Sequence, residues 1–279
     1  MKEIIEIVFN ASMFAFAAGS MITVGLGLAL SQLIEPFKNI RMVVLSLISN
    51  FLVVPLFALG LVWVIPVSEG VRIGIILLSI TGGAPFIPMI VATAKGRVGS
   101  AVGLMLLLLV TTIFYIPIIV PFVLPDAVIS SADIAASLMY SMLIPLALAL
   151  LVKAYFPTIA SRVLPIFAQL TNVSIFLVII TLVYLYTEVI ISAAHALPIA
   201  TLFFIGSMAI GYFTGGKNRH TRIVLSAGTG LRNTPVAMLV ASQHLPEQPM
   251  ATIVPLLVAV IGLLILFPLA KRVGNLATK

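Results

Sequence analysis

The sequence predicts an all-α polytopic membrane protein with nine transmembrane helices, and three observations carry this prediction. The chain has 279 residues, of which 62% are hydrophobic and only 8% are charged. Its apolar runs recur from end to end instead of forming one soluble core. Two of these runs carry glycine and proline at matching positions. We therefore expect one membrane transport domain over 1–279, built as an inverted repeat with two broken, crossing helices.

Each crossing of the hydrocarbon layer takes about 20 apolar residues, which sets the length of every expected span. The spans are expected at 4–30, 40–64, 71–94, 98–124, 133–154, 163–187, 193–214, 221–243 and 250–270. The first span resembles a signal peptide because Lys2 precedes an apolar run. Glu3, Glu6 and the continuation of the run to about Leu30 favour a membrane span instead.

The loop charges predict the orientation. Nine spans place the two termini on opposite sides, and only Lys2 and Arg72 fall on the side of the N-terminus. The basic residues on the other side are Lys38, Arg41, Lys95, Arg97, Lys153, Arg162, Lys217, Arg219, Arg222, Lys271, Arg272 and Lys279. Because positive loops stay inside, we expect an external N-terminus and a cytoplasmic C-terminus, in the inner or plasma membrane. Arg232 is the one charge expected deep in the bilayer.

Composition excludes several other functions. The chain has no cysteine, which removes disulfides and thiolate chemistry. No acidic residue is expected at mid-membrane, and the three histidines fall in loops or at span ends, so neither a catalytic pair nor a metal site is predicted. The net charge of +7 is spread singly or in pairs between apolar runs, which does not favour nucleic acid. We expect no enzyme activity, no cofactor and no obligate protein partner.

The third and eighth spans carry the interruptions ITGGAPFIPM, 80–89, and AGTGLRNTPV, 227–236. The predicted hinge residues are Gly82, Gly83, Pro85, Pro88, Gly228, Gly230 and Pro235. Glycine and proline destabilise a continuous helix, and in hydrocarbon the freed backbone groups need protein or water partners. The plain alternative is that they only allow kinks or close helix packing.

A shift of 147 residues places Gly83 on Gly230 and Pro88 on Pro235, and it lays span two near span seven and span four on span nine. The two copies begin five spans apart. Because five is odd, the second copy must be upside down relative to the first, which is the plan of many secondary transporters.

At such a crossing, helix ends with partial charges meet near the midplane. We expect Thr234 to cap the second half of span eight and Pro235 to be its first helical residue. The first half would end near 227–228. Arg232 could donate to the freed carbonyls there, or bind a substrate carboxylate. A third interpretation is a purely structural arginine that never meets substrate.

Three stretches resemble the bile acid:sodium symporter family. They are MITVGLGLALSQLIEPFKNIRMVV, SITGGAPFIPMIVATAKGRVGSAVGL and SAGTGLRNTPVAMLVASQH. The resemblance implies a nine-span member, with a panel of 4–30, 133–154 and 163–187 facing a core of 40–124 and 193–270. An organic anion would bind between panel and core, and their relative movement would give alternating access.

In sodium-coupled members the second crossing helix has the pattern Glu-x-Gly-x-Gln-Asn, and its Glu and Gln help to bind sodium. Here Gly228 and Arg232 stand at those two positions, while Gly230 and Asn233 match the pattern. The other family sodium ligands correspond to Phe86, Ile87 or Pro88, and to Ala101 and Met105. None of these side chains supplies a hard oxygen, and a guanidinium would repel sodium.

We therefore expect a sodium-independent carrier of a small organic anion, by uniport or exchange, with Arg232 in place of the coupling cation. The expected substrate contacts are Arg232, Asn233, Thr229, Thr81, Ala84, Thr234 and Asn172. The alternatives are a sodium- or proton-coupled symporter, including an auxin-carrier-like relative, and a channel-like or signalling membrane protein on the same scaffold. Apart from the anion, only the lipid bilayer is expected as a partner.

Overall fold

The structure, a computed structural model, describes residues 2–28, 39–124 and 130–276. Every regular element in these ranges is helical. Two residues used above to predict orientation, Lys38 and Lys279, lie outside the described residues. The last two residues of the first expected span, 29–30, do so as well.

Five expected spans correspond to helical segments of similar bounds. Helix α1 covers Lys2–Gly27 and α7 covers Val98–Val123. The range 40–64 is α3 (Ile40–Ile48), the π-helix η2 (Ser49–Val53) and α4 (Val54–Val64). The range 133–154 is α8 (Ser131–Leu138), η3 (Met139–Leu143) and α9 (Ile144–Tyr155). Helix α14 covers Pro249–Leu276.

The expected spans 163–187 and 193–214 follow each other without a loop. Helix α10 covers Pro157–Ser192, longer than expected at both ends, and leaves helical geometry at Tyr186. A short 3-10 turn, η4 (Ala193–Ala196), leads directly into α11 (Leu197–Thr214). In the described ranges, six helical stretches are long and apolar enough to cross a membrane, and one of them is this joined stretch from Pro157 to Thr214.

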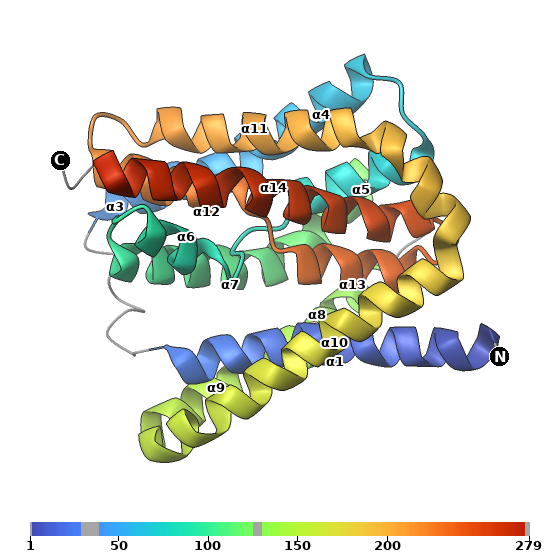
Figure 1. The fold of residues 1–279 in the computed structure, drawn as a ribbon, viewed down its shortest axis with the longest axis horizontal. Coiled ribbons are helices and arrows are strands. Elements are labelled where there is room, and N and C mark those ends of the chain that lie inside the picture. The colour runs from blue at the N-terminus through green and yellow to red at the C-terminus, as the bar shows by residue number, and fades with distance from the viewer. Residues whose placement is uncertain (1, 29–38, 125–129, 277–279) are drawn as a thin grey trace.

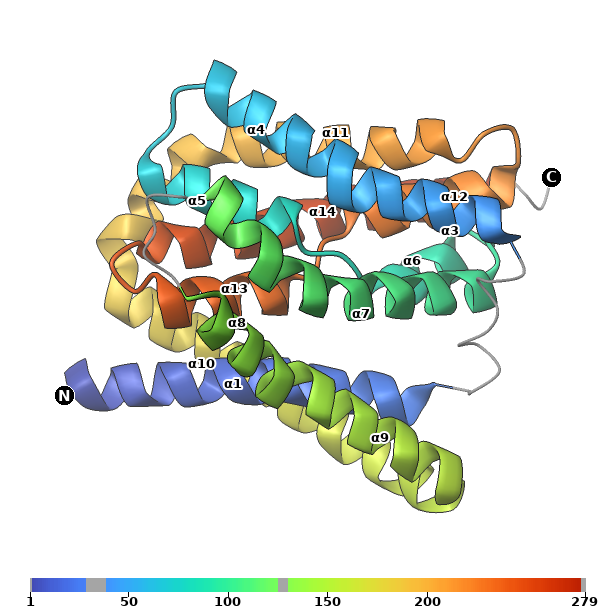
Figure 2. The ribbon, with the colours of Figure 1, turned by 180° about the vertical axis from the view of Figure 1, so that it is seen from behind.

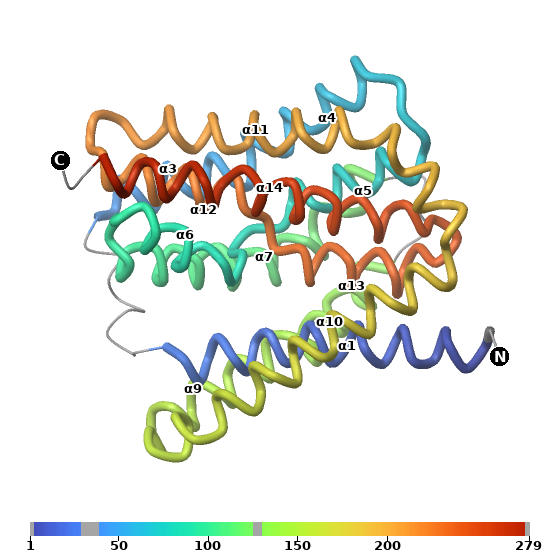
Figure 3. Tube along the Cα trace, viewed as in Figure 1, coloured from blue at the N-terminus to red at the C-terminus, as the bar shows by residue number. Residues whose placement is uncertain are grey.

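The two ranges with glycine and proline each contain two helices. Helix α5 (Glu69–Ser79) is separated from α6 (Ile87–Thr93) by 80–86. Helix α12 (Arg219–Gly230) is separated from α13 (Thr234–His244) by 231–233. The first half of this range thus ends at Gly230 rather than near 227–228 as expected. Both interruptions lie near the middle of the molecule in the trace of Figure 3.

The helices lie in two groups along a common long axis (Figures 1 and 2). In one, α1 packs against α10 and α9. In the other, α11 packs on α12, and α14 packs on α5 and α13. The groups meet where α1 and α8 contact α13 and where α10 contacts α14. The start of α1 and the end of α14 lie at opposite ends of the molecule (Figure 1).

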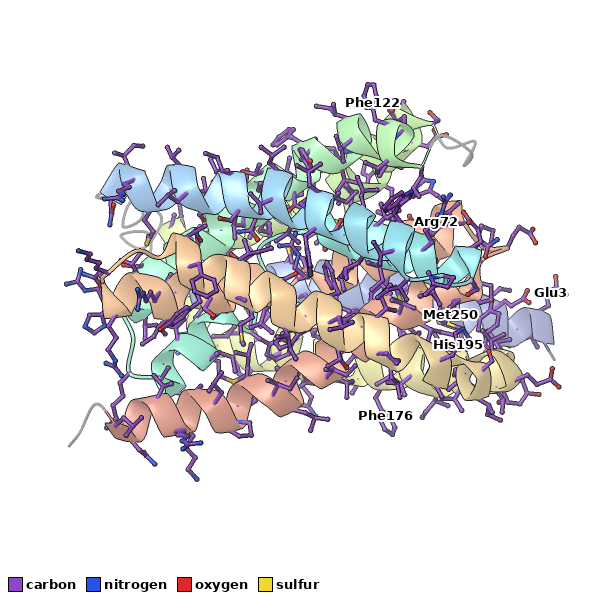
Figure 4. The ribbon with its side chains drawn as sticks, turned by 90° about the horizontal axis from the view of Figure 1, so that it is seen from above. Glu3, Arg72, Phe122, Phe176, His195 and Met250 are labelled. Carbon is purple, nitrogen blue, oxygen red and sulfur yellow. The ribbon has the colours of Figure 1, made fainter. Side chains whose placement is uncertain are left out.

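The outer surface is apolar, as expected of a protein that faces lipid. Trp63, Phe122 and Phe213 are each more than three-quarters exposed, and Phe176 points outward in Figure 4. Figure 4 also places Glu3, Arg72 and His195 toward the same end of the molecule. Such apolar exposure would be costly in water, and in a bilayer it is the ordinary condition of a spanning helix. The chain is a multi-pass membrane protein.

Candidate functional site

The first interruption depends on a glycine that no other residue can replace without strain. Gly83 has φ of +80°, and a Cβ added to it would lie 2.4 Å from the backbone nitrogen of Leu109. Beside it, the N–H of Gly82 donates to Thr112 Oγ1 over 2.7 Å, and the same hydroxyl donates to the Gly82 carbonyl over 3.3 Å. Helix α7 therefore supplies partners for backbone groups that the interruption frees.

The second interruption is shorter and is capped by a different residue from the one expected. Asn233, not Thr234, is the N-cap of α13, and its Oδ1 accepts a hydrogen bond from the N–H of Val236 over 3.4 Å. Thr234 is the first helical residue and Pro235 the second. Threonine and asparagine both cap helices, but the asparagine side chain is the one that reaches the first turn here.

The two interruptions contact each other through Asn233. Its backbone N–H donates to the Thr81 carbonyl, and its side-chain Nδ2 donates to the Gly83 carbonyl, each over 3.4 Å. Asn233 is fully buried, and Thr81 is 1% exposed. One asparagine thus caps α13 and joins it to the segment that follows α5.

Arg232 is 4% exposed, and all five of its N–H groups donate to protein oxygens. Its Nε donates to the Leu78 carbonyl over 3.2 Å, and Nη2 donates to the carbonyls of Ser79 and of Asn50. Its Nη1 donates to Asn50 Oδ1 and to the Thr229 carbonyl, the latter over 3.4 Å. A substrate anion can bond to this guanidinium only by displacing one of these oxygens.

Most of the oxygens around Arg232 lie where helix geometry leaves carbonyls without their usual partners, at helix ends and before a proline. The Leu78 carbonyl also accepts from the Thr81 N–H over 3.1 Å. Leu78 and Ser79 end α5, and Thr229 lies in the last turn of α12, so their carbonyls carry the partial negative charge of two helix ends. Pro55 has no N–H to offer the carbonyls four and five residues before it. These are the carbonyls of Phe51 and Asn50. The Phe51 carbonyl accepts from the Tyr115 hydroxyl over 2.6 Å instead, and the Asn50 carbonyl accepts from Arg232.

Asn50 is the member of this cluster that sequence reasoning missed. It is fully buried in η2, and its Nδ2 donates to the Ser46 carbonyl over 2.9 Å and to Thr229 Oγ1 over 3.3 Å. An asparagine in the middle of an apolar span was the available signal, because such polar side chains often mark helix contacts or function. Every acidic side chain in the described ranges is exposed, so the charge of Arg232 has no carboxylate partner there.

A cavity of about 350 Å³ lies beside this cluster. It opens between α1 and α10 on one side and the two interruptions with α14 on the other. Of the expected substrate contacts, Ala84, Asn172, Arg232 and Thr234 line it. The other expected contacts, Thr81, Thr229 and Asn233, are buried behind its wall. Substrate contact by all seven stays a prediction.

Three polar groups of this cavity have no hydrogen-bond partner in the described ranges. They are the hydroxyls of Ser20 and Thr234 and the amide of Asn172. Sequence reasoning missed Ser20, a small polar residue among the apolar residues of α1. The rest of the wall is largely apolar and includes Phe16 and Phe204. The cavity therefore suits a ligand with an apolar body and a small polar or charged group.

The expected hinge residues fall as follows. Pro85, Gly230 and Pro235 line the cavity, and Pro88 lies in the first turn of α6. A Cβ at Gly228 would lie 2.9 Å from Leu104 Cδ2, and one at Gly230 would lie 3.1 Å from the Met208 Cβ. These two glycines remain inside α12, where their lack of a side chain allows close packing.

The other positions that the resemblance aligns with sodium ligands, apart from Gly228 and Arg232, carry no polar side chain. Ile87, Ala101 and Met105 are buried in the apolar core, and Phe86 faces the cavity. The described residues contain no cluster of three histidine or acidic side chains that could hold a metal ion.

The family follows from a comparison with known families. The model described as Sodium Bile acid symporter family matches residues 18–193, more than half of the chain. The chain belongs to this family. The resemblance found from the sequence is thereby confirmed, and the protein is a member of a family of transporters. The matched range includes the first interruption and ends before the second, which carries Arg232. No curated protein matches the chain.

Proposed function

We propose that this member of the Sodium Bile acid symporter family carries a small organic anion by alternating access without sodium coupling, by uniport or exchange. The observation that carries the proposal is the place of Arg232. Its fixed positive charge lies among carbonyls at the ends of α5 and α12, where a bound cation would otherwise offset the partial negative charge.

Sodium would meet two obstacles at this place. It needs several hard oxygens, and here the Asn50, Ser79 and Thr229 oxygens already accept hydrogen bonds from Arg232. A guanidinium within a few ångströms would also repel the ion strongly in a site of low dielectric. A charge fixed to the chain does not cross the membrane with the substrate. Arg232 therefore cannot couple substrate transport to an ion gradient, as a bound sodium ion would.

The proposed architecture has nine spans and an inverted repeat. The pairs α5–α6 and α12–α13 would each make one broken span, and the stretch from Pro157 to Thr214 would make two spans. A shift of 147 residues lays α6 on α13 and α7 on α14 within a few residues. The start of α1 and the end of α14 lie at opposite ends, which supports an odd number of spans (Figure 1). The loop charges favour an external N-terminus.

The proposed division into panel and core rests on the cavity. Helices α1, α8, α9 and α10 would form the panel and the remaining helices the core. The cavity lies between α1 and α10 on one side and the interruptions on the other, where a relative movement of the two groups would change access. The proposed substrate therefore binds to both groups at once.

In this cavity the anion would bond to Ser20, Asn172 and Thr234, and its apolar part would lie against the aromatic walls. The first-turn N–H groups of α13 are satisfied within the chain, because Thr234 donates to the Arg232 carbonyl and Val236 to Asn233. Arg232 and the backbone N–H groups at the start of α13 would thus attract an anion mainly through their positive potential, while the Thr234 hydroxyl would bond to it directly.

The experiment is anion counterflow in proteoliposomes. Organic anions are first screened for stabilisation of the purified protein, and those that raise its melting temperature are loaded into vesicles. Saturable exchange that is equal in sodium and potassium buffers is the expected result. Exchange that requires sodium would instead establish the second candidate, a sodium-coupled symporter, which the family name favours. Exchange driven by a proton gradient would establish proton coupling.

A further inference from the structure

A second hollow lies away from the cavity, between α6, α11, α12 and α14. Its volume is about 610 Å³, within the usual range of small-molecule sites. None of the residues that line it also lines the cavity. We call it the basic groove, and define it by Met208, Ala209, Phe213, Lys217, Arg219, Arg222 and Leu269 together with the neighbouring residues of the same helices.

The walls of the basic groove are apolar and face outward. Phe213 is 76% exposed and Leu269 is 40% exposed, while Met208, Ile223 and Leu266 lie deeper. In a membrane protein such a surface meets acyl chains and not water. An apolar tail that enters the groove would cover these side chains along α11 and α14.

One end of the groove carries three basic residues, Lys217, Arg219 and Arg222. Arg219 uses one N–H, which donates to a carbonyl of α14 over 2.9 Å. Arg222 donates through Nε to the Gly216 carbonyl and through Nη1 to the Tyr212 hydroxyl, the latter over 3.2 Å. Its guanidinium also lies 4.8 Å from the centre of the Tyr212 ring.

Most donors of these three side chains are therefore free. A guanidinium has five N–H groups and an ammonium three. The part of the chain that the structure describes offers Lys217, Arg219 and Arg222 no carboxylate partner, since its six acidic side chains form no ion pair with them. The groove thus combines apolar walls with a cluster of three basic side chains that have no carboxylate partner in the described ranges.

We propose that the basic groove binds an anionic phospholipid of the bilayer, with the phosphate at Lys217, Arg219 and Arg222 and an acyl chain along Met208, Phe213 and Leu269. A free phosphate would use the cations and leave the apolar walls empty. A zwitterionic lipid would fill the walls and leave the cations without net charge compensation. Of these three ligands, the anionic lipid is the one that matches both parts of the groove.

The test is phosphatidylglycerol binding by native mass spectrometry, on full-length protein purified in a neutral detergent. The charge variant is Lys217→Gln/Arg219→Gln, and its matched control is Lys271→Gln/Arg272→Gln, two exposed basic residues of α14 that do not line the groove. We expect the charge variant to bind phosphatidylglycerol about thirtyfold more weakly than wild type, and the control to bind it within about twofold.

Ala209→Trp tests the apolar part, because a tryptophan there would fill the groove without changing its charge. It should weaken phosphatidylglycerol binding at least about tenfold, by excluding the acyl chain. This variant also keeps the proposal testable if the charge variant fails to fold.

Three results would overturn the proposal. Phosphatidylcholine could bind as tightly as phosphatidylglycerol, which would remove the role of the cations. The control could lose as much affinity as the charge variant, which would indicate attraction by net charge alone. Finally, inorganic phosphate could displace the lipid while Ala209→Trp leaves lipid binding unchanged, which would reduce the groove to an ion site.

Discussion

Replacing Arg232 by glutamine removes the link between three parts of the core. The guanidinium joins the end of α5, the last turn of α12 and Asn50 in η2. Glutamine is shorter and has two N–H groups in place of five, so it can reach at most part of this set. We expect Arg232→Gln to fold with a markedly lower thermal stability.

The size of the loss follows from the oxygens left behind. Four oxygens, the carbonyls of Ser79, Thr229 and Asn50 and the Asn50 Oδ1, have no other hydrogen-bond partner in the described ranges, and the glutamine amide can bond to about one of them. The Leu78 carbonyl keeps Thr81, whose hydroxyl donates to it over 2.8 Å. An unsatisfied buried acceptor costs about 1–3 kcal/mol. Removing a buried charge returns part of this cost, so we take the lower end, about 3 kcal/mol in total.

For a chain of this size, about 3 kcal/mol lowers the melting temperature by roughly 10 °C. The only tryptophan, Trp63, is 87% exposed and reports poorly on the core. Stability is therefore better followed as the monodisperse fraction that survives heating, by size-exclusion chromatography. Arg162→Gln is the matched control, since Arg162 is exposed and makes no hydrogen bond in the described ranges. A melting temperature of Arg232→Gln within about 2 °C of this control would refute the reasoning.

Further substitutions test the interruptions, the cavity and the movement. Gly83→Ala should destabilise the protein by about 3 kcal/mol or more in the same heating assay, from its positive φ and the backbone clash, while Gly60→Ala, with open space around it, should be neutral. Thr234→Val should weaken binding of the identified anion about tenfold at unchanged stability, measured by titration calorimetry. Ser137→Cys/Gln243→Cys should be joined by a short reducible thiol crosslinker between α8 and α13, because the Ser137 hydroxyl contacts the end of the Gln243 side chain, and the crosslink should abolish counterflow until reduced.

Each of these has a result that contradicts it. A stable Gly83→Ala variant would mean that the segment between α5 and α6 adapts freely. Unchanged affinity of Thr234→Val would remove its hydroxyl from the substrate site. Full counterflow with the cysteine pair crosslinked would show that α8 and α13 need not separate during transport. The absence of native cysteine makes the last experiment free of background thiols.

The sequence predicted a largely helical chain with long apolar segments and an interruption near Gly83, because both signals are local. Apolar length defines a membrane helix, and the residues around Gly83 and Pro88 remove hydrogen bonds wherever they stand. The end of α12 at Gly230 was not predictable in this way. Gly228 and Gly230 stay helical because Leu104 and Met208 pack against them, and this packing comes from α7 and α11.

The candidate site was predicted only in part, because its polar residues are visible in the sequence and their long-range contacts are not. Arg232 and Asn233 are conspicuous in an apolar span, but which oxygens surround them depends on contacts across 150 residues or more. Asn50 looked like one polar residue among many, and only the fold brings it beside Arg232. Ser20 and Asn172 lie in helices far apart in the chain, so their common cavity follows from tertiary packing alone.

The most direct test of the central claim compares the melting temperature of the purified protein in sodium chloride and in potassium chloride at equal ionic strength. A bound ion at 100 times its dissociation constant adds about 2.7 kcal/mol. The account predicts the same melting temperature in both salts for the wild type, because Arg232 takes the place of the cation and the other aligned ligand positions carry no hard oxygen. A sodium-specific rise in wild type would contradict the account and make the protein a sodium-coupled symporter.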